Sequence, residues 1–427
     1  MRNSFIIVAT LISLFGASCT RQQTGHSLIS IQLTDKNGLK QTISHEDRLK
    51  GFKNLDFHRP QPYEKVIRNY IDKTSKRDFS KITTYHPNGQ IFQSLDVVAG
   101  RACGFYHEWY ANGLRKVEVT VIEGPGDLTP ASQCNWIFDG VSKAFDEHGY
   151  LEAEIHYDKG VLSGNSLYFY PQGQVKRAIT FENGLESGTE LFFDIKESII
   201  KERAYSFGKL HGKSLCKNNS NEPNFSEYYE EGLLIEGDYF DFEGASIYKV
   251  ADKNGYRPIF KEGKLQMVQT IDEGRVEGEM RCFNSQGHVV NTYFLKNNKK
   301  EGAEWVYFSG PGKKPKLYLE WKEDAICGIS RSYYATGTVA SEREMVDNKK
   351  QGLLTAYYED GTLKIMETYD NDKLVHGKYM RKGEMDPTSV VENGSGKALF
   401  FDETGKQIQS VVYDKGKVLI DSEGTSD

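Results

Sequence analysis

Histidines are the side chains of this 427-residue sequence best suited to acid-base or metal chemistry, and the spacing of the ten present supports neither. His107 and Glu108 begin the zinc-binding pattern His-Glu-x-x-His, but Ala111 occupies the position of the second histidine. His148 and His288 fall beside expected hairpin turns, where exposed polar residues are common. The sequence contains no Gly-x-Ser-x-Gly turn, no phosphate loop and no Gly-x-Gly-x-x-Gly fingerprint. We therefore expect no catalytic residue, no cofactor and no enzymatic activity.

Metal-binding patterns are equally weak. Acidic turns such as Asp146 to Gly149 and Asp402 to Gly405 supply one or two carboxylates each. A calcium loop needs roughly six to eight oxygen ligands at fixed positions. We interpret these turns as solvated hairpin tips. The sequence also lacks a Cys-x-x-Cys pair, so neither zinc binding nor thioredoxin-like chemistry is indicated, and we expect no metal site.

Five cysteines follow the N-terminal segment, an odd number that prevents complete pairing within the chain. Cys103 and Cys134 bracket an irregular stretch and are a possible disulfide pair. We interpret the other three as small buried apolar residues, and they are Cys216, Cys282 and Cys327.

The first 18 residues have the layout of a cleaved export signal. Arg2 precedes the apolar run Phe5 to Phe15, which as a helix would rise about 16 Å, roughly half the thickness of a hydrocarbon core. Three small residues and Cys19 follow. This ending resembles a lipobox, where bacterial lipoproteins are cleaved and acylated on the new N-terminal cysteine, although Gly16 replaces the usual leucine. The alternative is an ordinary secretory signal in which Cys19 is incidental.

A lipobox implies lipid attachment at Cys19, with palmitate among the acyl chains, and hence a membrane as one partner. We expect a location in the bacterial cell envelope, with the outer membrane or the surface favoured over the inner membrane. The expected second partner is a protein or another envelope component. The formal net charge of −6 comes from interspersed acidic and basic residues. Because no basic stripe is present, nucleic acid is not an expected partner.

The dominant feature of the sequence is a glycine-punctuated repeat of 24 residues, whose leading glycines include Gly140, Gly164, Gly188 and Gly212. Side chains alternate along a strand, so the first, third and fifth positions after the leading glycine share one face. The fifth position is nearly always aromatic, which predicts one buried aromatic stripe per strand. The residues at that position are Trp109, Phe145, Phe169, Phe193, Phe283, Tyr307, Tyr333, Tyr357 and Phe401.

A second glycine closes turns such as Pro-Asn-Gly at 87–89 and Glu-Asp-Gly at 359–361, which suit tight hairpin tips with positive φ. A second strand and a returning turn complete each unit. The predicted fold is therefore all-β: an extended array of antiparallel β-hairpin repeats that forms a long twisted sheet or solenoid.

The repeat is interrupted by an insertion at 124–134, by a spacing of 66 between Gly212 and Gly278, and by a shortened unit with a surface excursion around 382–396. Inserted loops of repeat proteins often carry specificity. The predicted organisation is a signal peptide (1–18), an N-terminal tether with some local structure near 63–71 (19–80), a first half of repeats (81–216), divergent repeats (217–277), a second half (278–421) and a tail (422–427).

The unit resembles the variant MORN-type repeat of bacterial proteins named after the YwqK-family antitoxin. The matching segments are YFYPQGQVKRAITFENGLESG (Tyr168 to Gly188) and AYYEDGTLKIMETYDNDKLVHG (Ala356 to Gly377). The resemblance covers roughly residues 80 to 420 and, together with the lipobox, the layout is similar to repeat lipoproteins of chlamydia-like bacteria. It implies the hairpin fold and leaves the biochemical role open.

We expect a membrane-anchored, non-catalytic protein that binds a partner through its repeats. An aromatic-lined face is the expected binding surface, with Trp109, Trp305, Tyr333 and Tyr357 as candidate residues. The alternative is that these rings belong to the core. The resemblance also suggests an antitoxin that neutralises a toxin, against which the export signal argues. It further suggests phospholipid binding by the repeats, against which the lack of a basic patch argues.

Overall fold

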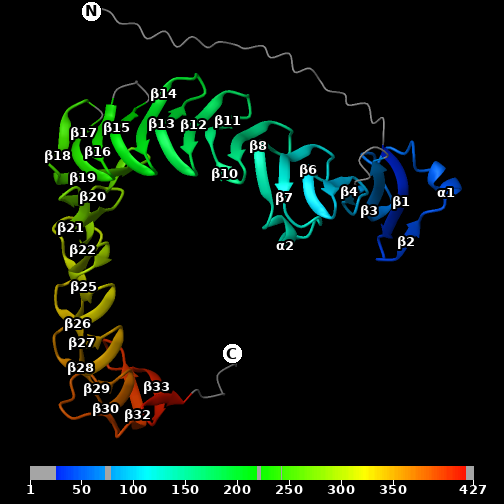
Figure 1. The fold of residues 1–427 in the computed structure, drawn as a ribbon. Coiled ribbons are helices and arrows are strands. Elements are labelled where there is room, and N and C mark those ends of the chain that lie inside the picture. The colour runs from blue at the N-terminus through cyan, green and yellow to red at the C-terminus, as the bar shows by residue number, and fades with distance from the viewer. Residues whose placement is uncertain (1–25, 73–77, 219–222, 242, 420–427) are drawn as a thin grey trace, which may run out of the picture. The chain divides into compact units, whose positions relative to one another are not determined.

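The computed structural model describes residues 26–72, 78–218, 223–241 and 243–419 (Figure 1). Within these residues the chain forms 34 strands and two short helices, and the strands belong to an antiparallel sheet that is not closed. Most pairings join strands that are adjacent in the chain, so the sheet is built from successive hairpins. The prediction of an all-β array of antiparallel hairpin repeats is confirmed.

The chain divides into two compact units, the first comprising Met1–Ser187 and Phe193–Ser198, the second Gly188–Phe192 and Ile199–Asp427. β13 (Leu185–Phe193) contains the division between them. The other elements of the first unit are β1 (His26–Asp35), β2 (Lys40–Ile43), α1 (Glu46–Lys50), β3 (Tyr63–Asp72), β4 (Asp78–Tyr85), β5 (Ile91–Val98), β6 (Arg101–Trp109), β7 (Arg115–Glu123), α2 (Pro130–Gln133), β8 (Ile137–Phe145), β9 (Leu151–Asp158), β10 (Val161–Leu162), β11 (Gly164–Phe169) and β12 (Val175–Glu182).

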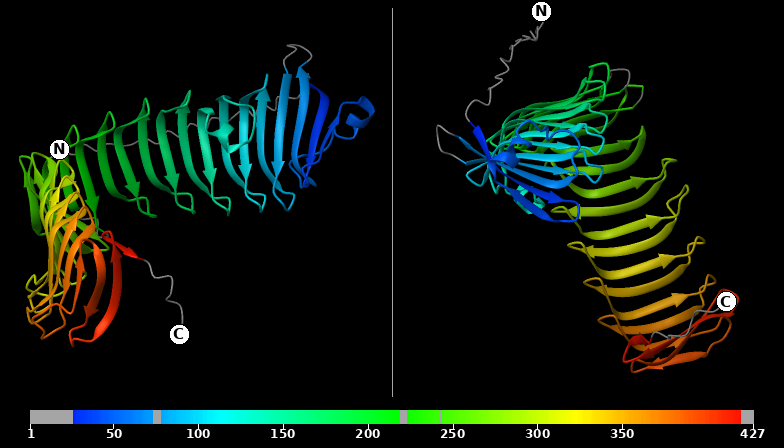
Figure 2. Two further views of the ribbon diagram at one scale, coloured as in Figure 1. Left: turned by 90° about the horizontal axis from the view of Figure 1, so that it is seen from below. Right: turned by 90° about the vertical axis from the view of Figure 1, so that its right-hand side faces the viewer.

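The second unit contains the remaining strands. They are β14 (Ile199–Ser206), β15 (Lys209–Lys217), β16 (Pro223–Glu230), β17 (Leu233–Phe240), β18 (Ser246–Ala251), β19 (Asn254–Lys261), β20 (Lys264–Asp272), β21 (Arg275–Phe283), β22 (Val289–Lys296), β23 (Lys299–Lys300), β24 (Gly302–Tyr307), β25 (Pro315–Lys322), β26 (Ala325–Tyr333), β27 (Val339–Val346), β28 (Lys349–Tyr357), β29 (Leu363–Asp370), β30 (Lys373–Tyr379), β31 (Ser389–Glu392), β32 (Ser395–Phe401), β33 (Gln407–Asp414) and β34 (Lys417–Leu419). Figure 2 shows the strands of each unit side by side in a single layer.

The hairpin tips are held by short acidic or amide side chains. Asp146 Oδ1 accepts the backbone N–H groups of His148 and Tyr150, both at 2.9 Å, and Gly149 completes the turn at φ +87°. An L-residue with a Cβ would be strained at that φ, so glycine is the natural choice. The same arrangement recurs at Asp402. These carboxylates are therefore occupied in capping turns.

A tyrosine one position after the aromatic fifth position ties neighbouring repeats together at the tips. In the first unit, the Tyr170 hydroxyl donates to the carbonyl of Phe193 at 2.8 Å. In the second, Tyr334 donates to the carbonyl of Tyr357 at 2.9 Å. Each such bond satisfies a backbone acceptor of the next repeat, so it fixes the spacing of adjacent hairpins.

The buried face of the repeat differs from the predicted one. The second position after the leading glycine is the most buried, and its occupants are Ser166, Glu190, Ser214, Met280, Glu304 and Ser330. Of the predicted aromatic stripe, only Trp109 and Phe401 are buried, and the rings between them are half-buried. In a single-layered sheet no second layer covers the aromatic face, so its rings pack only along the sheet.

The predicted N-terminal tether is in part a folded element. From His26 onward it forms β1 to β3 and α1, and Ile31, Leu33 and Val66 are buried in a common core with Trp109. Alternation of apolar residues in β1 and β3 explains this, because it gives each strand one buried face. The predicted signal peptide and Cys19 lie outside the described residues.

Two further findings concern the expected anchor and disulfide. None of the described helices is long and apolar enough to cross a membrane. Cys103 and Cys134 are free and exposed rather than bonded to each other. Cys103 follows the buried Ala102 on β6 and so faces the other side of that strand, while Cys134 caps the end of α2.

Candidate functional site

A hollow of the second unit with a volume of about 440 Å³ lies over strands β14 to β19. We call the described residues of the range 199–261, which contains these strands, the cavity module. Lys201 and Arg203 of β14 line one end, and Phe225 of β16 and Ile259 of β19 line the walls. The volume is within the range of about 300–1,000 Å³ that is typical of small-molecule sites.

A fully hydrogen-bonded carboxylate lies at the centre of the module. Only 2% of the Glu227 side chain is exposed, and its Oε1 accepts Arg257 Nε at 2.7 Å and the Tyr239 hydroxyl at 2.8 Å. Its Oε2 accepts the Tyr229 hydroxyl at 2.9 Å and Arg257 Nη2 at 3.3 Å. Burial and the negative charge of Glu227 raise the pKa of Tyr239. Each carboxylate oxygen of Glu227 already accepts two hydrogen bonds. Glu227 therefore holds the strands of the module together and is not available as a general base.

Two cations lie side by side at the β14 end of the hollow. Lys201 Nζ lies 5.4 Å and Arg203 Cζ 5.9 Å from the centre of the Phe192 ring. Arg203 Nη1 is 3.7 Å from the buried carboxylate of Glu190. Among the described residues, no carboxylate lies within ion-pair distance of Lys201 Nζ. Burial and the neighbouring Arg203 lower the pKa of Lys201.

Two glycines allow the strands to bend around this centre. A Cβ on Gly237 would lie 2.7 Å from the Tyr239 hydroxyl, so only glycine leaves room for the ring to reach Glu227. Gly255 has φ +149°, and a Cβ there would lie 2.1 Å from the carbonyl oxygen of Lys249. The close approach of β18 and β19 therefore depends on the missing side chain.

The second unit contains this arrangement twice. The pattern Glu-x-Tyr-x4-Leu-x2-Gly-x-Tyr occurs at 227–239 and again 140 positions later at 367–379. Strands β14, β15 and β16 begin and end 140 positions before β27, β28 and β29. The registers agree as well, since Gly237 pairs with Val250 and Gly377 with Val391. We call residues 339–401 the packed module.

The packed module keeps the buried acid but changes its surroundings. Glu367 accepts the hydroxyl of Tyr379 at 2.7 Å and that of Tyr369 at 2.9 Å. From Val250 and Val391 onward the offset between the modules is 141 positions, so the counterpart of Arg257 is Ala398, which is fully buried. Among the described residues, no lysine or arginine lies within ion-pair distance of Glu367.

The packed module is also closed where the cavity module is open. Phe260 is 41% exposed, whereas its counterpart Phe401 is 1% exposed. Tyr358 is completely buried and donates to the carbonyl of Met380, while its counterpart in the cavity module is the smaller Asn218. The same scaffold therefore buries Phe401 in one copy and leaves its counterpart Phe260 at the wall of a hollow in the other.

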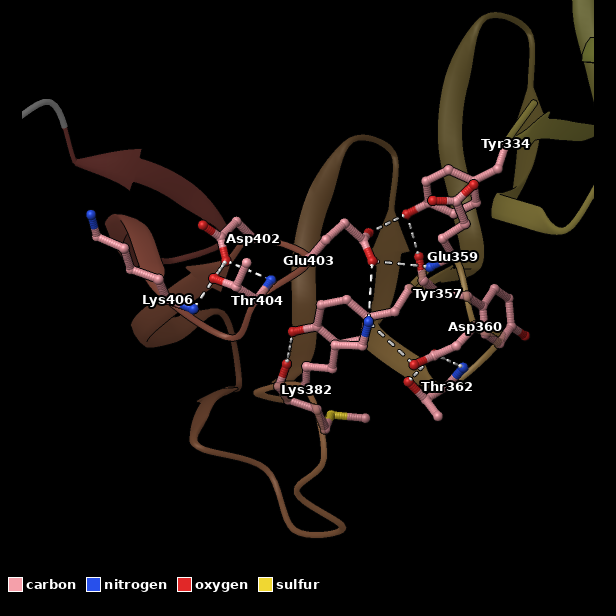
Figure 3. A network of polar contacts seen from close by, with 12 residues as sticks. Tyr334, Tyr357, Glu359, Asp360, Thr362, Lys382, Asp402, Glu403, Thr404 and Lys406 are labelled. Atoms are coloured by element: carbon pink, nitrogen blue, oxygen red, sulfur yellow. Dashed lines mark hydrogen bonds and ion pairs between the residues drawn. The ribbon is translucent and has the colours of Figure 1, made fainter. Parts of the chain in front are cut away.

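A polar network at three hairpin tips covers this part of the packed module (Figure 3). Glu403 Oε1 accepts the Tyr334 hydroxyl at 2.9 Å, and Oε2 accepts the backbone N–H of Glu359 at 3.2 Å. Lys382 Nζ lies 3.3 Å from Asp360 Oδ2 and 3.7 Å from Glu403 Oε2. The counterpart of Glu403 is Glu262, which instead lines the hollow of the cavity module.

The four aromatic residues expected to bind a partner lie in different environments. Trp109 is 7% exposed in the core of the first unit. Trp305 and Tyr333 are half-buried in the second unit, with ring centres 6.3 Å apart. Tyr357 is also half-buried, and its carbonyl accepts Tyr334. The structure thus brings two of the four rings together, and neither module's acid centre contains any of them.

Sequence reasoning missed the Glu227 centre and the hollow beside it. The useful indication is the duplicated Glu-x-Tyr-x4-Leu-x2-Gly-x-Tyr pattern, which falls where the 24-residue period breaks and so does not emerge from counting leading glycines. Among the described residues, no group of three or more His, Cys, Asp or Glu is placed to hold a metal ion.

A family model described as a MORN repeat variant matches residues 350–371. The matched segment covers nearly all of β28 and all of β29, the central hairpin of the packed module. This match indicates a binding role carried by the repeats. No curated protein matches the chain.

Proposed function

We propose that this protein is a non-catalytic binding scaffold of the bacterial cell envelope, anchored by acyl chains on Cys19, that holds an envelope component on its repeats. The observation that carries this proposal is a group of half-buried rings in mutual contact. The ring of Trp305 lies 4.5 Å from that of Tyr318, directly across the β24–β25 pair, and the Tyr333 ring of β26 stacks against Trp305 with its centre 6.3 Å away. Such partly exposed aromatic clusters are characteristic of binding surfaces.

Polar groups border these rings on the neighbouring strands. Arg331 lies directly opposite Tyr318 and forms an ion pair with Glu342 of the next strand. Aromatic residues bordered by an arginine and other polar groups are the usual anatomy of a protein-binding surface. The surface therefore suits a folded protein or peptide that offers apolar groups with polar groups at its margin.

The envelope location rests on the lipobox-like end of the export signal. The repeat also resembles both the YwqK-type antitoxin repeat and lipoproteins of chlamydia-like bacteria, and the proposal follows the second of these. Acyl chains on a single terminus hold a soluble array at a membrane surface, because each buried CH₂ contributes about 0.8 kcal/mol.

Proximity labelling from the full-length protein tests the binding role. We expect the double variant Trp305→Ala/Tyr333→Ala to lose a distinct set of labelled neighbours. Phe145→Ala/Phe169→Ala, which removes half-buried rings at the fifth repeat position in the first unit, is the matched control. An unchanged set of neighbours in the first variant would remove the aromatic group from the proposal.

Detergent partitioning tests the anchor separately. Wild type should enter the detergent phase, and Cys19→Ala should remain in the aqueous phase because it cannot be acylated. Equal partitioning of the two proteins would refute the lipid anchor and leave the binding surface untouched.

A further inference from the structure

We infer that the hollow of the cavity module is a binding site for an amphipathic carboxylate, an anion with an apolar body of about ten carbons. Its carboxylate would lie at Lys201 and Arg203, and its body would extend over the apolar wall toward Tyr239. This site goes beyond the proposed scaffold role, because it concerns a small molecule and uses none of the residues of the aromatic group.

Charge complementarity fixes the sign of the ligand. Arg257 is neutralised by Glu227, and Arg203 shares the charge of the buried Glu190. Lys201 remains without a carboxylate partner among the described residues. The β14 end of the hollow therefore carries a half-buried lysine with no carboxylate at ion-pair distance among the described residues, and an anion is attracted more strongly there than in water.

The wall of the hollow fixes the character of the ligand body. Phe225, Phe240 and Ile259 line it, and Phe260 and Ile247 reach it from β19 and β18. Phe260 and Ile247 are each about two-fifths exposed, at 41%. Leaving such large apolar side chains in contact with water is unfavourable, and an apolar ligand would remove that cost.

The packed module is an internal control for the ligand site of the cavity module. It has the same strands, register and buried acid, yet it buries Phe401 and Met380 with its own side chains. Lys201 has Ser341 as its counterpart there, so the uncompensated cation is absent as well. The exposed rings and the cation therefore occur together, in the copy that is hollow.

The strand register sets the length of the ligand. Lys201 pairs with Cys216, Cys216 with Phe225, and Phe225 with Tyr239. Three strand spacings separate the backbones of Lys201 and Tyr239 by about 14 Å, which is about the full length of an extended ten-carbon acid with its carboxylate and terminal methyl included. Asp241 and Glu262, which follow the ends of β17 and β19, also line the hollow and would repel a second anionic group.

Calorimetric titration of the full chain with decanoate tests the site directly. The chain carries Cys19→Ser in this experiment, so that attached acyl chains cannot compete. We expect saturable binding of decanoate with one site, and at least tenfold weaker binding of decyltrimethylammonium, which has the same apolar body and the opposite charge. Lys201→Met should weaken decanoate binding about tenfold. Lys213→Met is the matched control, because Lys213 lies on the same hairpin and is exposed outside the hollow.

A second readout does not depend on any variant of the site. Cys216 lines the hollow, so decanoate should slow its alkylation by a maleimide, measured by peptide mass spectrometry. Cys327, half-buried elsewhere in the second unit, should react at an unchanged rate. Absence of decanoate binding, equal binding of the two probes, or unprotected Cys216 would each overturn the inference. None of these results bears on the aromatic group or on the anchor, so the two proposals fail independently.

Discussion

The cavity module and the packed module are two copies of one arrangement that differ in how they fill their interior. In both, two tyrosine hydroxyls donate hydrogen bonds to a buried glutamate, and a glycine leaves room for the second tyrosine ring. The cavity module adds Arg257 to the acid and has a hollow beside it, whereas the packed module has Ala398 at that position and buries Phe401, the counterpart of Phe260. A repeat scaffold can thus keep its backbone and register while one copy is free to bind a ligand.

Replacement of Arg257 should cause the largest loss of stability among the substitutions in the two modules. Arg257→Met leaves Glu227 buried with two phenols, so we expect the free energy of unfolding to fall by about 3 kcal/mol in urea denaturation. The added change Glu227→Gln should restore part of the loss, because a neutral amide needs no cation. A cost near the 0.5 kcal/mol typical of surface substitutions would mean that the packed arrangement also suffices for Glu227.

Alanine at either of the two admitting glycines should lower the stability of the protein. In Gly237→Ala and Gly377→Ala the new Cβ would lie 2.7 Å from a tyrosine hydroxyl, which must then move away from its glutamate. We expect each variant to lose about 2 kcal/mol of stability, measured by the same denaturation. Gly51→Ala is the control, since φ there is −67° and the added Cβ meets only ordinary contacts. A loss no larger than that of the control in either variant would show that the tyrosine ring does not need the space that the glycine leaves.

Loss of a single hydroxyl should distinguish the modules. Tyr379→Phe leaves Glu367 with Tyr369 alone as its hydrogen-bond donor among the described groups, so we expect a cost of about 2 kcal/mol. Tyr239→Phe should cost about 1 kcal/mol, because Glu227 retains Arg257 and Tyr229. The reverse order would contradict the role assigned to Arg257.

Alkaline pH should weaken both modules slightly. Burial and the adjacent glutamate raise the pKa of Tyr239 and of Tyr379 above the ordinary value. The unfolded chain therefore releases these phenol protons first, so the stabilisation is complete below pH 10 and is lost as the pH rises further. At pH 11 the loss is about 1.4 kcal/mol per tyrosine. Denaturation at pH 9 and pH 11 checks this, and Tyr239→Phe/Tyr379→Phe should show a smaller pH effect than wild type.

The hairpin fold followed from local features of the sequence. Glycine at the turns and alternation along the strands gave the all-β array, and Asp146 to Gly149 was interpreted as a hairpin tip because a short acid and a glycine suit such turns. These features act over a few residues, so one repeat is enough to recognise them. The sequence also showed that the repeat is interrupted at 217–277 and 382–396. It did not show that these two regions resemble each other.

The face that is buried was decided by tertiary structure. The aromatic fifth position suggested a core, yet the buried row runs through Ser166, Glu190 and Glu304. Alternation assigns residues to two faces but does not say which face is covered, because that depends on how the sheet curves and on what packs against it. Because the sheet is a single layer, most of the aromatic rings remain half-buried.

The sequence by itself determined the strands, the turns and the period, since these depend on backbone preferences and side-chain alternation within a hairpin. Tertiary structure alone decided that Lys201, Glu227 and Arg257 meet around one hollow. These residues come from strands separated by turns and a broken period, and only strand register places them together. A buried acid acquires its partners by position in space, and that position is a property of the assembled sheet.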